Sequence, residues 1–289
     1  MRATFRSQPT SNSDIDPNIE PHALQHFAAP AMSAMSPGTV EEALDCMDFG
    51  IKYFNQRGDR RAIFLFAYRV VTEQMRDAIR RHSVVFFHDP EWMSHLVGAF
   101  ATLYFRSLRT FERPFGEEKA WKLAHGLAIS KSSTVLQDVL LGVNAHIKYD
   151  LPVALEQNLR DAAHSQRELA TREHDHDRAN LLLARSITAL RSAIQGSYGD
   201  SLRVFDRGIL HIDVHVADLV GRYNRWRVWT DAVALLRAPS VARRQAIIQR
   251  MDINSARTAE FIRRWFVPPW VGSERSAARW PDHSDSSSR

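Results

Sequence analysis

A histidine and an aspartate, His146 and Asp150, stand four residues apart in an apolar stretch of the sequence. On a helix they would project from the same face, about one turn apart. An imidazole and a carboxylate so placed can share a divalent metal ion, or the carboxylate can orient the imidazole as a general base. The same spacing suits a buried hydrogen-bonded pair that only fixes helix packing, because buried polar groups need partners. The spacing alone leaves these interpretations open.

Two amides belong to the same segment. Asn144 would lie on a neighbouring helix face, and Gln137 a little over two turns before His146. The run from Leu140 to Ile147 is too apolar for a surface helix, so we predict that it is a buried central helix. We therefore take His146, Asp150 and Asn144 as candidate catalytic residues and Gln137 as a candidate substrate-binding residue.

A second histidine cluster precedes the C-terminal part of the chain. His211, His215 and Asp218 would share one helix face at i, i+4 and i+7. Two histidines at this spacing are a workable metal platform, but the glutamate of the HExxH signature is absent, so the chain is not a zincin. With 13 histidines in the chain, chance pairs are expected.

The run from Glu173 to Asp177 alternates carboxylates and imidazoles. Its density of donor atoms suits a metal ion. Its position before a predicted helix equally suits an acidic N-terminal cap, and we favour the cap for Asp175 and Asp177.

An aromatic and arginine-rich run extends from Arg222 to Trp229. Arg225 could bind an anion or stack on a ring of a ligand through a cation–π contact. Core packing by the aromatic side chains with arginine at the rim is the more ordinary alternative. There is no Gly-x-Ser-x-Gly elbow, and the single cysteine, Cys46, has no catalytic signature around it.

Composition bounds the class of protein. One cysteine allows no intrachain disulfide, which fits a reducing cytoplasm. The net charge of +5 invites a nucleic-acid hypothesis, but the arginines are scattered among carboxylates, so we expect no nucleic-acid partner. The sequence has no nucleotide or haem signature. Every apolar run is interrupted by charge, so we expect no membrane span.

Glycine and proline are few, at 12 each, and lie between apolar segments of helical period, which predicts an all-α, single-domain helical bundle. We expect a disordered leader at 1–36, a helical domain at 37–270 and a disordered tail at 271–289. Within the domain the pattern predicts helices at 40–57 with Thr39 as N-cap, 61–81, 91–111, 121–153 with a break near 126 or 130–134, 154–167, 178–195, 201–238 and 241–265.

The stretch from Leu140 to Ala154 resembles the signature of a bacterial family catalogued as domain of unknown function 5995, whose members carry a similar Leu-Leu-Leu-Gly-x-Asn-Ala-His-Ile-x-x-Asp-Leu-x-x-Ala run. Looser similarities lie at Tyr68, at Asp89 with Phe100 and Tyr104, at Asp177 with Asn180, at Asp206 and Asp213, and at Arg225 with Trp229. The resemblance covers about residues 60–234. It implies an all-helical fold and no assigned activity, and it gives the second histidine cluster no support.

Two functions remain open. In the first, the chain is an enzyme acting on a small molecule, by hydrolysis or by cyclisation or isomerisation, either through a divalent metal or through His/Asp acid–base chemistry. Its metal ligands would then be His146, Asp150, Asp89, Asp177 and Asp213, and its substrate-binding residues Gln137, Tyr68, Tyr104, Arg225 and Trp229. In the second, the chain is a non-catalytic helical module that binds a ligand or protein, and the polar residues form a structural network. The oligomeric state stays open.

Overall fold

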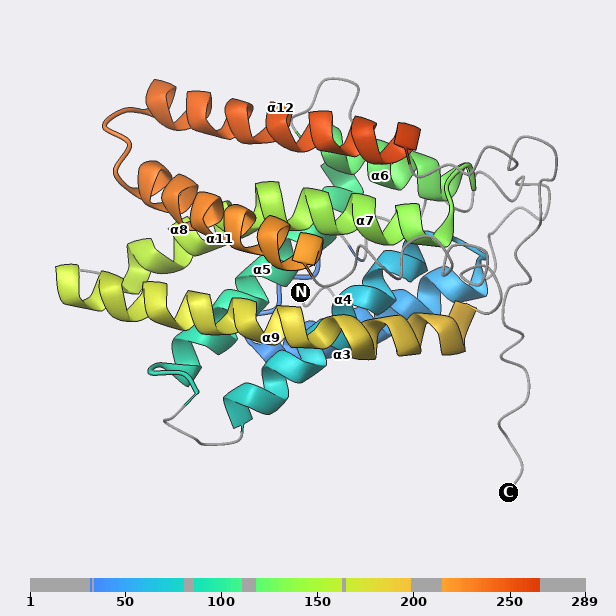
Figure 1. Cartoon of the computed structure of the whole chain (residues 1–289), viewed down its shortest axis with the longest axis horizontal. Coiled ribbons are helices and arrows are strands. Elements are labelled where there is room, and N and C mark those ends of the chain that lie inside the picture. The colour runs from blue at the N-terminus through green and yellow to red at the C-terminus, as the bar shows by residue number, and fades with distance from the viewer. Residues whose placement is uncertain are drawn as a thin grey trace, which may run out of the picture.

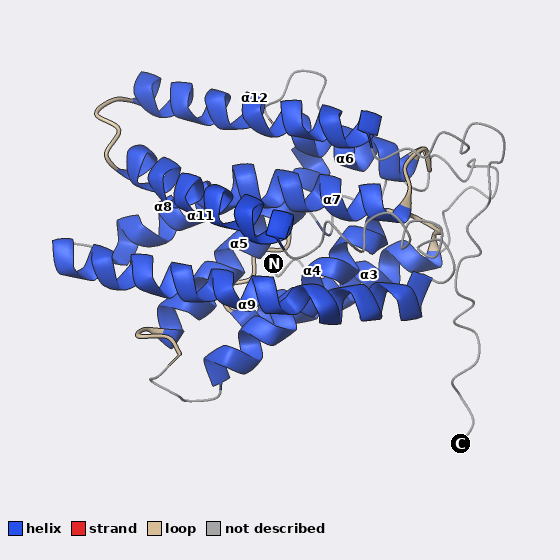
Figure 2. Ribbon diagram, in the orientation of Figure 1, coloured by secondary structure: helices blue, strands red, loops and turns tan. Residues whose placement is uncertain are grey.

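The computed structural model describes Met32 and residues 34–80, 86–110, 118–162, 165–198 and 215–265. Within these ranges all regular structure is helical and there is no strand, as predicted (Figure 2). The helices are α3 Val40–Gln56, α4 Arg61–Arg80, α5 Pro90–Thr110, α6 Lys119–Ile129, α7 Val135–Ala145, the π-helical turn η1 His146–Asp150, α8 Leu151–Ala162, α9 Gln166–Tyr198, α11 His215–Leu236 and α12 Val241–Trp265.

The continuous path α7, η1 and α8 forms the centre of the bundle. Helix α7 packs against α4, α6 and α12, and α8 packs against α5 and α11 (Figure 1). The π-helical turn between them contacts α5, α11 and α12. The prediction of a buried central helix is therefore confirmed, and its polar side chains face other helices from several directions.

Side-chain caps define where three helices begin. The hydroxyl of Thr39 accepts a hydrogen bond from the backbone N–H of Glu42 at the start of α3, as predicted. The carboxylate of Asp89 accepts one from the N–H of Trp92 at the start of α5. Thr134 and Gln137 form a reciprocal capping box at the start of α7. Each cap satisfies backbone donors that have no partner inside the helix.

Pro152 explains the wide turn that follows His146. Proline has no backbone N–H, and its ring collides with the carbonyl four residues earlier in a regular α-helix. Here the chain forms a π-helical turn, in which the N–H of Leu151 bonds to the carbonyl of His146, and α8 continues through Pro152. The predicted boundary at 153–154 is thus wrong, and the helix changes its winding at His146 without ending.

The region around Glu173 also differs from the prediction. Helix α9 begins at Gln166 and runs to Tyr198, so the run from Glu173 to Asp177 lies inside a long helix and does not precede one. The predicted cap at Asp175 and Asp177 for a helix starting near 178 is wrong. The turn expected at 196–200 is helical as far as Tyr198, and residues 199–200 lie outside the described ranges.

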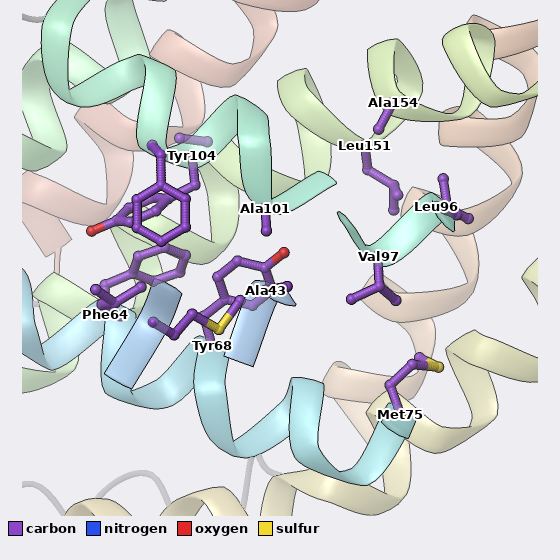
Figure 3. Packing of buried hydrophobic residues seen from close by; sticks show 14 of the residues in the cluster. Ala43, Phe64, Tyr68, Met75, Leu96, Val97, Ala101, Tyr104, Leu151 and Ala154 are labelled. Atoms are coloured by element: carbon purple, nitrogen blue, oxygen red, sulfur yellow. The ribbon is translucent and has the colours of Figure 1, made fainter. Parts of the chain in front are cut away.

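An aromatic core holds α4, α5, α6 and α7 together. Figure 3 shows Phe64, Tyr68 and Tyr104 gathered in this core. Gly142 allows the closest approach, because a Cβ atom at this position would lie 2.2 Å from the Phe64 ring. The glycine in the central helix therefore lets an aromatic side chain pack directly on its backbone.

The predicted disordered leader and tail, 1–36 and 271–289, lie outside the described residues except for Met32 and 34–36. Met32 is fully buried in the core. Among the described helices, none has the length and apolar character to cross a membrane.

Candidate acid-base site

His146 and Asp150 meet at the π-helical turn. The Nδ1 atom of His146 lies 2.8 Å from Oδ2 of Asp150, and the indole N–H of Trp121 donates to the same oxygen at 3.0 Å. Both side chains of the pair are almost fully buried. A π-helical turn is rare and often occurs at functional sites. The pair predicted from the four-residue spacing is therefore formed, with Trp121 as a third member.

Aromatic rings surround the imidazole of His146. Phe100 stacks on it in parallel, with ring centroids 3.5 Å apart, and Tyr68 meets it edge to face at 4.4 Å. Further rings, Phe64, Tyr104 and Trp121, lie with centroids 5.9 to 6.3 Å away. The predicted pocket aromatics Tyr68 and Tyr104 are thus beside the dyad. This aromatic cage, made of these five rings, gives the imidazole an apolar setting.

The second ring nitrogen of His146 points into this setting without a partner. Nε2 is buried, and the described residues offer it no hydrogen bond. The hydroxyl of Tyr68, also buried, likewise lacks a partner within the described part of the chain. Buried polar atoms are nearly always paired, so unpaired ones mark strain or a functional role.

Burial sets the protonation of the dyad. It lowers the pKa of His146 well below the usual histidine value, because desolvation penalises the imidazolium. It also raises the pKa of Asp150 well above the usual value, with the charge of Glu118 adding to the shift and the Trp121 N–H and Arg106 opposing it. Burial, with a contribution from Asp150, raises the pKa of Tyr68 as well.

The lowered pKa of His146 and the raised pKa of Asp150 describe one behaviour when the two groups titrate together as a dyad. With only the Nδ1 proton between the groups, the dyad carries a negative charge. A second proton makes it neutral overall, and a third makes it positive. An apolar setting favours the neutral state, so the dyad takes up its second proton readily and resists the third. It can therefore give and accept one proton through Nε2.

The two amides of the segment face away from the dyad. The Nδ2 atom of Asn144 donates to the carbonyl of Ser255 at 2.9 Å, on α12. Gln137 uses its oxygen in the capping box and its Nε2 to donate to the carbonyls of Ile262 and Arg263. Both amides tie the central helix to α12, so their hydrogen bonds serve helix packing.

The carboxylates expected to complete a metal site lie elsewhere. Asp89 caps α5 and forms an ion pair with Arg172. Asp177 is exposed beside His176. In the described ranges no third imidazole, thiol or carboxylate gathers with His146 and Asp150. Asp213 is outside the described residues.

The remaining candidates come from α11 and the segment before it. Trp229 is buried, and its ring lies 5.6 Å from that of His176, between α11 and α9. The side chains of Arg225, His215 and Asp218 and the whole of His211 lie outside what the structure describes. The second histidine cluster and the role of Arg225 therefore stay predictions.

A family model described as a family of unknown function, DUF5995, matches residues 40–265. The chain belongs to this family. No curated protein and no solved structure matches it. Membership in DUF5995 confirms the resemblance seen in the central run, and the match covers every helix described here from α3 to α12.

In this DUF5995 chain a second polar group adjoins the cage. A small cavity, with room for about one water molecule, is lined by Arg60, Tyr104 and Asp138 among others. Arg60 donates to Asp138 at 2.7 and 2.9 Å, and the Asp138 side chain is almost fully buried. Burial raises the pKa of Asp138. This ion pair joins the residue before α4 to α7.

Two members of the site were not predicted. Trp121 holds Asp150, and Phe100 covers the face of His146, yet neither stands near them in sequence. A buried tryptophan needs a partner for its N–H, which is a reason to look for one but does not identify it. Phe100 belongs to the helix predicted at 91–111, and only the fold of the DUF5995 chain brings its side chain to His146.

Proposed function

We propose that this DUF5995 chain is an acid–base enzyme that moves a proton on a small, largely apolar molecule. His146 exchanges the proton through Nε2, and Asp150 compensates the charge on the imidazole. The observation that carries the proposal is the geometry of one buried ring: Nδ1 is held by Asp150 at 2.8 Å, while Nε2 is buried with no partner in the described part of the chain.

The arrangement matches the physical needs of a general base. In the neutral dyad Nε2 carries the second proton. When that proton leaves, Asp150 on Nδ1 fixes the tautomer in which Nε2 carries the lone pair, and it compensates the charge when Nε2 takes a proton back. Trp121 fixes the carboxylate in turn, since its N–H and the Nδ1 atom converge on one oxygen. Asp150 and Trp121 therefore orient the imidazole of His146, and Asp150 also sets its protonation.

The aromatic cage supports isomerisation or cyclisation over hydrolysis. Hydrolysis consumes a water molecule, whereas the walls around His146 are rings that exclude water. In an isomerisation, Nε2 gives its proton to one substrate atom and takes one back from another, while the bonding electrons shift within the substrate. No oxidant, reductant or further reactant is needed. Aromatic walls also favour an apolar, ring-containing substrate.

The set of donor atoms supports acid–base over metal chemistry at this position. Catalytic zinc sites hold their ion through three protein ligands. Among the described residues only His146 and Asp150 are placed to supply ligands here, and Asp150 already accepts a hydrogen bond from Trp121 on the oxygen that faces the imidazole.

Phe100 is the wall through which a substrate would reach His146. It stacks on the imidazole and is only partly buried, whereas His146 itself is 3% exposed. Access on this side requires the Phe100 side chain to move, and a substrate atom would then have to reach Nε2 in the plane of the imidazole ring, where its lone pair lies.

Deuterium exchange tests the proposal before the natural substrate has been identified. The full chain is incubated in D2O with a panel of small cyclic and polycyclic ketones, and mass spectrometry measures the deuterium that each gains at carbon. We expect exchange for at least one ketone, loss of that exchange in His146→Gln, and normal exchange in His95→Gln, a control at an exposed histidine of α5.

Two outcomes would contradict the proposal. One is equal exchange by the wild type and by His146→Gln, which would place the chemistry elsewhere. The other is no exchange above the buffer rate with any ketone in the panel, which would remove proton transfer at carbon as the activity.

A further inference from the structure

A second group of potential ligands lies between the start of α5 and the middle of α9. His88 precedes α5, and His174 and Asp175 are neighbours in α9. One donor atom from each of the three lies within 4.8 Å of the others. Among the described residues, this is the group of three histidine, cysteine or acidic side chains that lie close enough to share a metal ion. None of the three takes part in the His146 site.

The carboxylate of Asp175 is fixed in place. Its side chain is fully buried, and its two oxygens accept hydrogen bonds from the backbone N–H groups of His88 at 2.8 Å and Asp89 at 2.9 Å. Metal-binding carboxylates are commonly held by such outer hydrogen bonds. The backbone bonds do not depend on the imidazole of either histidine.

Two of the three donor atoms already lie at a distance that suits one ion. Nδ1 of His88 lies 3.0 Å from Oδ1 of Asp175, and the rings of His88 and His174 have centroids 4.7 Å apart. Two ligands about 2.1 Å from a zinc ion are separated by roughly 3.0 to 3.5 Å. The oxygen that now faces the imidazole nitrogen is therefore close enough for both atoms to bind the same ion after a small shift.

The surroundings hold the two segments together and leave an entry path. Arg178 donates to the carbonyl of Phe86 at 2.6 Å, and Arg172 pairs with Asp89. His88 and His174 are exposed on the solvent side of the buried Asp175. An ion could thus enter from solvent, bind two imidazoles and one carboxylate, and keep at least one position open.

We propose that His88, His174 and Asp175 form a binding site for a divalent transition-metal ion of the zinc class. Two imidazole nitrogens with one carboxylate oxygen are ligands that zinc and similar ions prefer. The ion joins the segment before α5 to α9. The site is separate from the His146 dyad, and its existence does not depend on the proposed acid–base function.

Zinc titration of the full chain, carrying no histidine tag, tests the proposal. Isothermal titration measures the affinity and stoichiometry for Zn²⁺, and Co²⁺ absorption reports the ligand set. We expect one zinc ion per chain in the wild type and at least about tenfold weaker binding in His88→Ala and in His174→Ala. His95→Ala, which removes an exposed histidine of α5 outside the cluster, should bind as the wild type does.

The two alanine variants keep the backbone bonds to Asp175, so circular dichroism should show wild-type helix content for both. Absence of stoichiometric zinc binding by the wild type overturns the proposal. So does wild-type affinity in His174→Ala, because the ion would then be held by other residues.

Discussion

Asp150→Asn keeps the size and the hydrogen-bond acceptor of the Asp150 side chain but removes its ability to ionise. The indole N–H of Trp121 and Nδ1 of His146 both approach Oδ2 of Asp150, at 3.0 and 2.8 Å. An asparagine with its carbonyl oxygen at that position accepts both bonds. We therefore expect the free energy of unfolding to change by no more than about 1 kcal/mol, within the range of a neutral hydrogen-bond exchange.

Asp150→Ala is the matched comparison, because it removes the acceptor altogether. It leaves the buried N–H groups of Trp121 and His146 without partners, and each unpaired group lowers the free energy of unfolding by about 1 to 3 kcal/mol. It also opens a small cavity. We expect a loss of roughly 3 to 5 kcal/mol in the free energy of unfolding. The two variants should thus differ by several kilocalories per mole at the same position.

Urea denaturation followed by circular dichroism, repeated at several pH values, measures both variants. Since the pKa of Asp150 is raised in the folded protein, the folded state binds more protons than the unfolded state above the ordinary aspartate pKa. The wild type should therefore lose stability relative to Asp150→Asn as the pH rises towards the raised pKa. A loss in Asp150→Asn as large as in Asp150→Ala, or the opposite trend with pH, would refute a neutral buried dyad.

Two further substitutions test the surroundings of the dyad. Gly142→Ala should lower the free energy of unfolding by about 1 to 3 kcal/mol, because the added Cβ would lie 2.2 Å from the ring of Phe64. Gly196→Ala is the control, since open space surrounds Gly196 and the substitution should not destabilise the protein. Thermal melts compare the two variants. Arg60→Ala should lower the free energy of unfolding by about 3 to 5 kcal/mol, because it leaves the buried Asp138 without its ion pair. Arg80→Ala removes an exposed ion pair and should lower it by less than about 1 kcal/mol. Urea denaturation measures both variants.

The sequence pattern predicted most helices because their apolar stripes and end signals are local. The expected ranges 61–81, 91–111 and 241–265 correspond to Arg61–Arg80, Pro90–Thr110 and Val241–Trp265. Thr39 at the start of α3 was predicted from its side chain alone and is confirmed. Such signals act within one turn of helix, so they do not depend on the rest of the fold.

The errors arose where the deciding contact is distant in sequence. Asp175 looked like a cap for the helix that follows it, but its carboxylate caps backbone groups 86 and 87 residues earlier. The helices predicted on either side of 153–154 are continuous, because a π-helical turn accommodates Pro152 and the turn packs against α5, α11 and α12. Neither result could be read from local propensity.

The same distinction applies to the site. The pairing of His146 with Asp150 follows from a spacing of four residues and was predicted. The roles of Trp121 and Phe100 depend on how α6 and α5 pack on the central path, and the spacing says nothing about them. Asn144 shared the apolar run with His146, yet its face of the helix turns to α12.

The rate of deuterium exchange catalysed by Asp150→Asn tests the central claim most directly, because this variant should keep the fold and the orientation of His146. If the dyad moves a proton, the lost carboxylate charge should slow exchange by about a hundredfold or more relative to the wild type. Exchange at the wild-type rate by a correctly folded Asp150→Asn variant would contradict the claim and leave the dyad a structural pair.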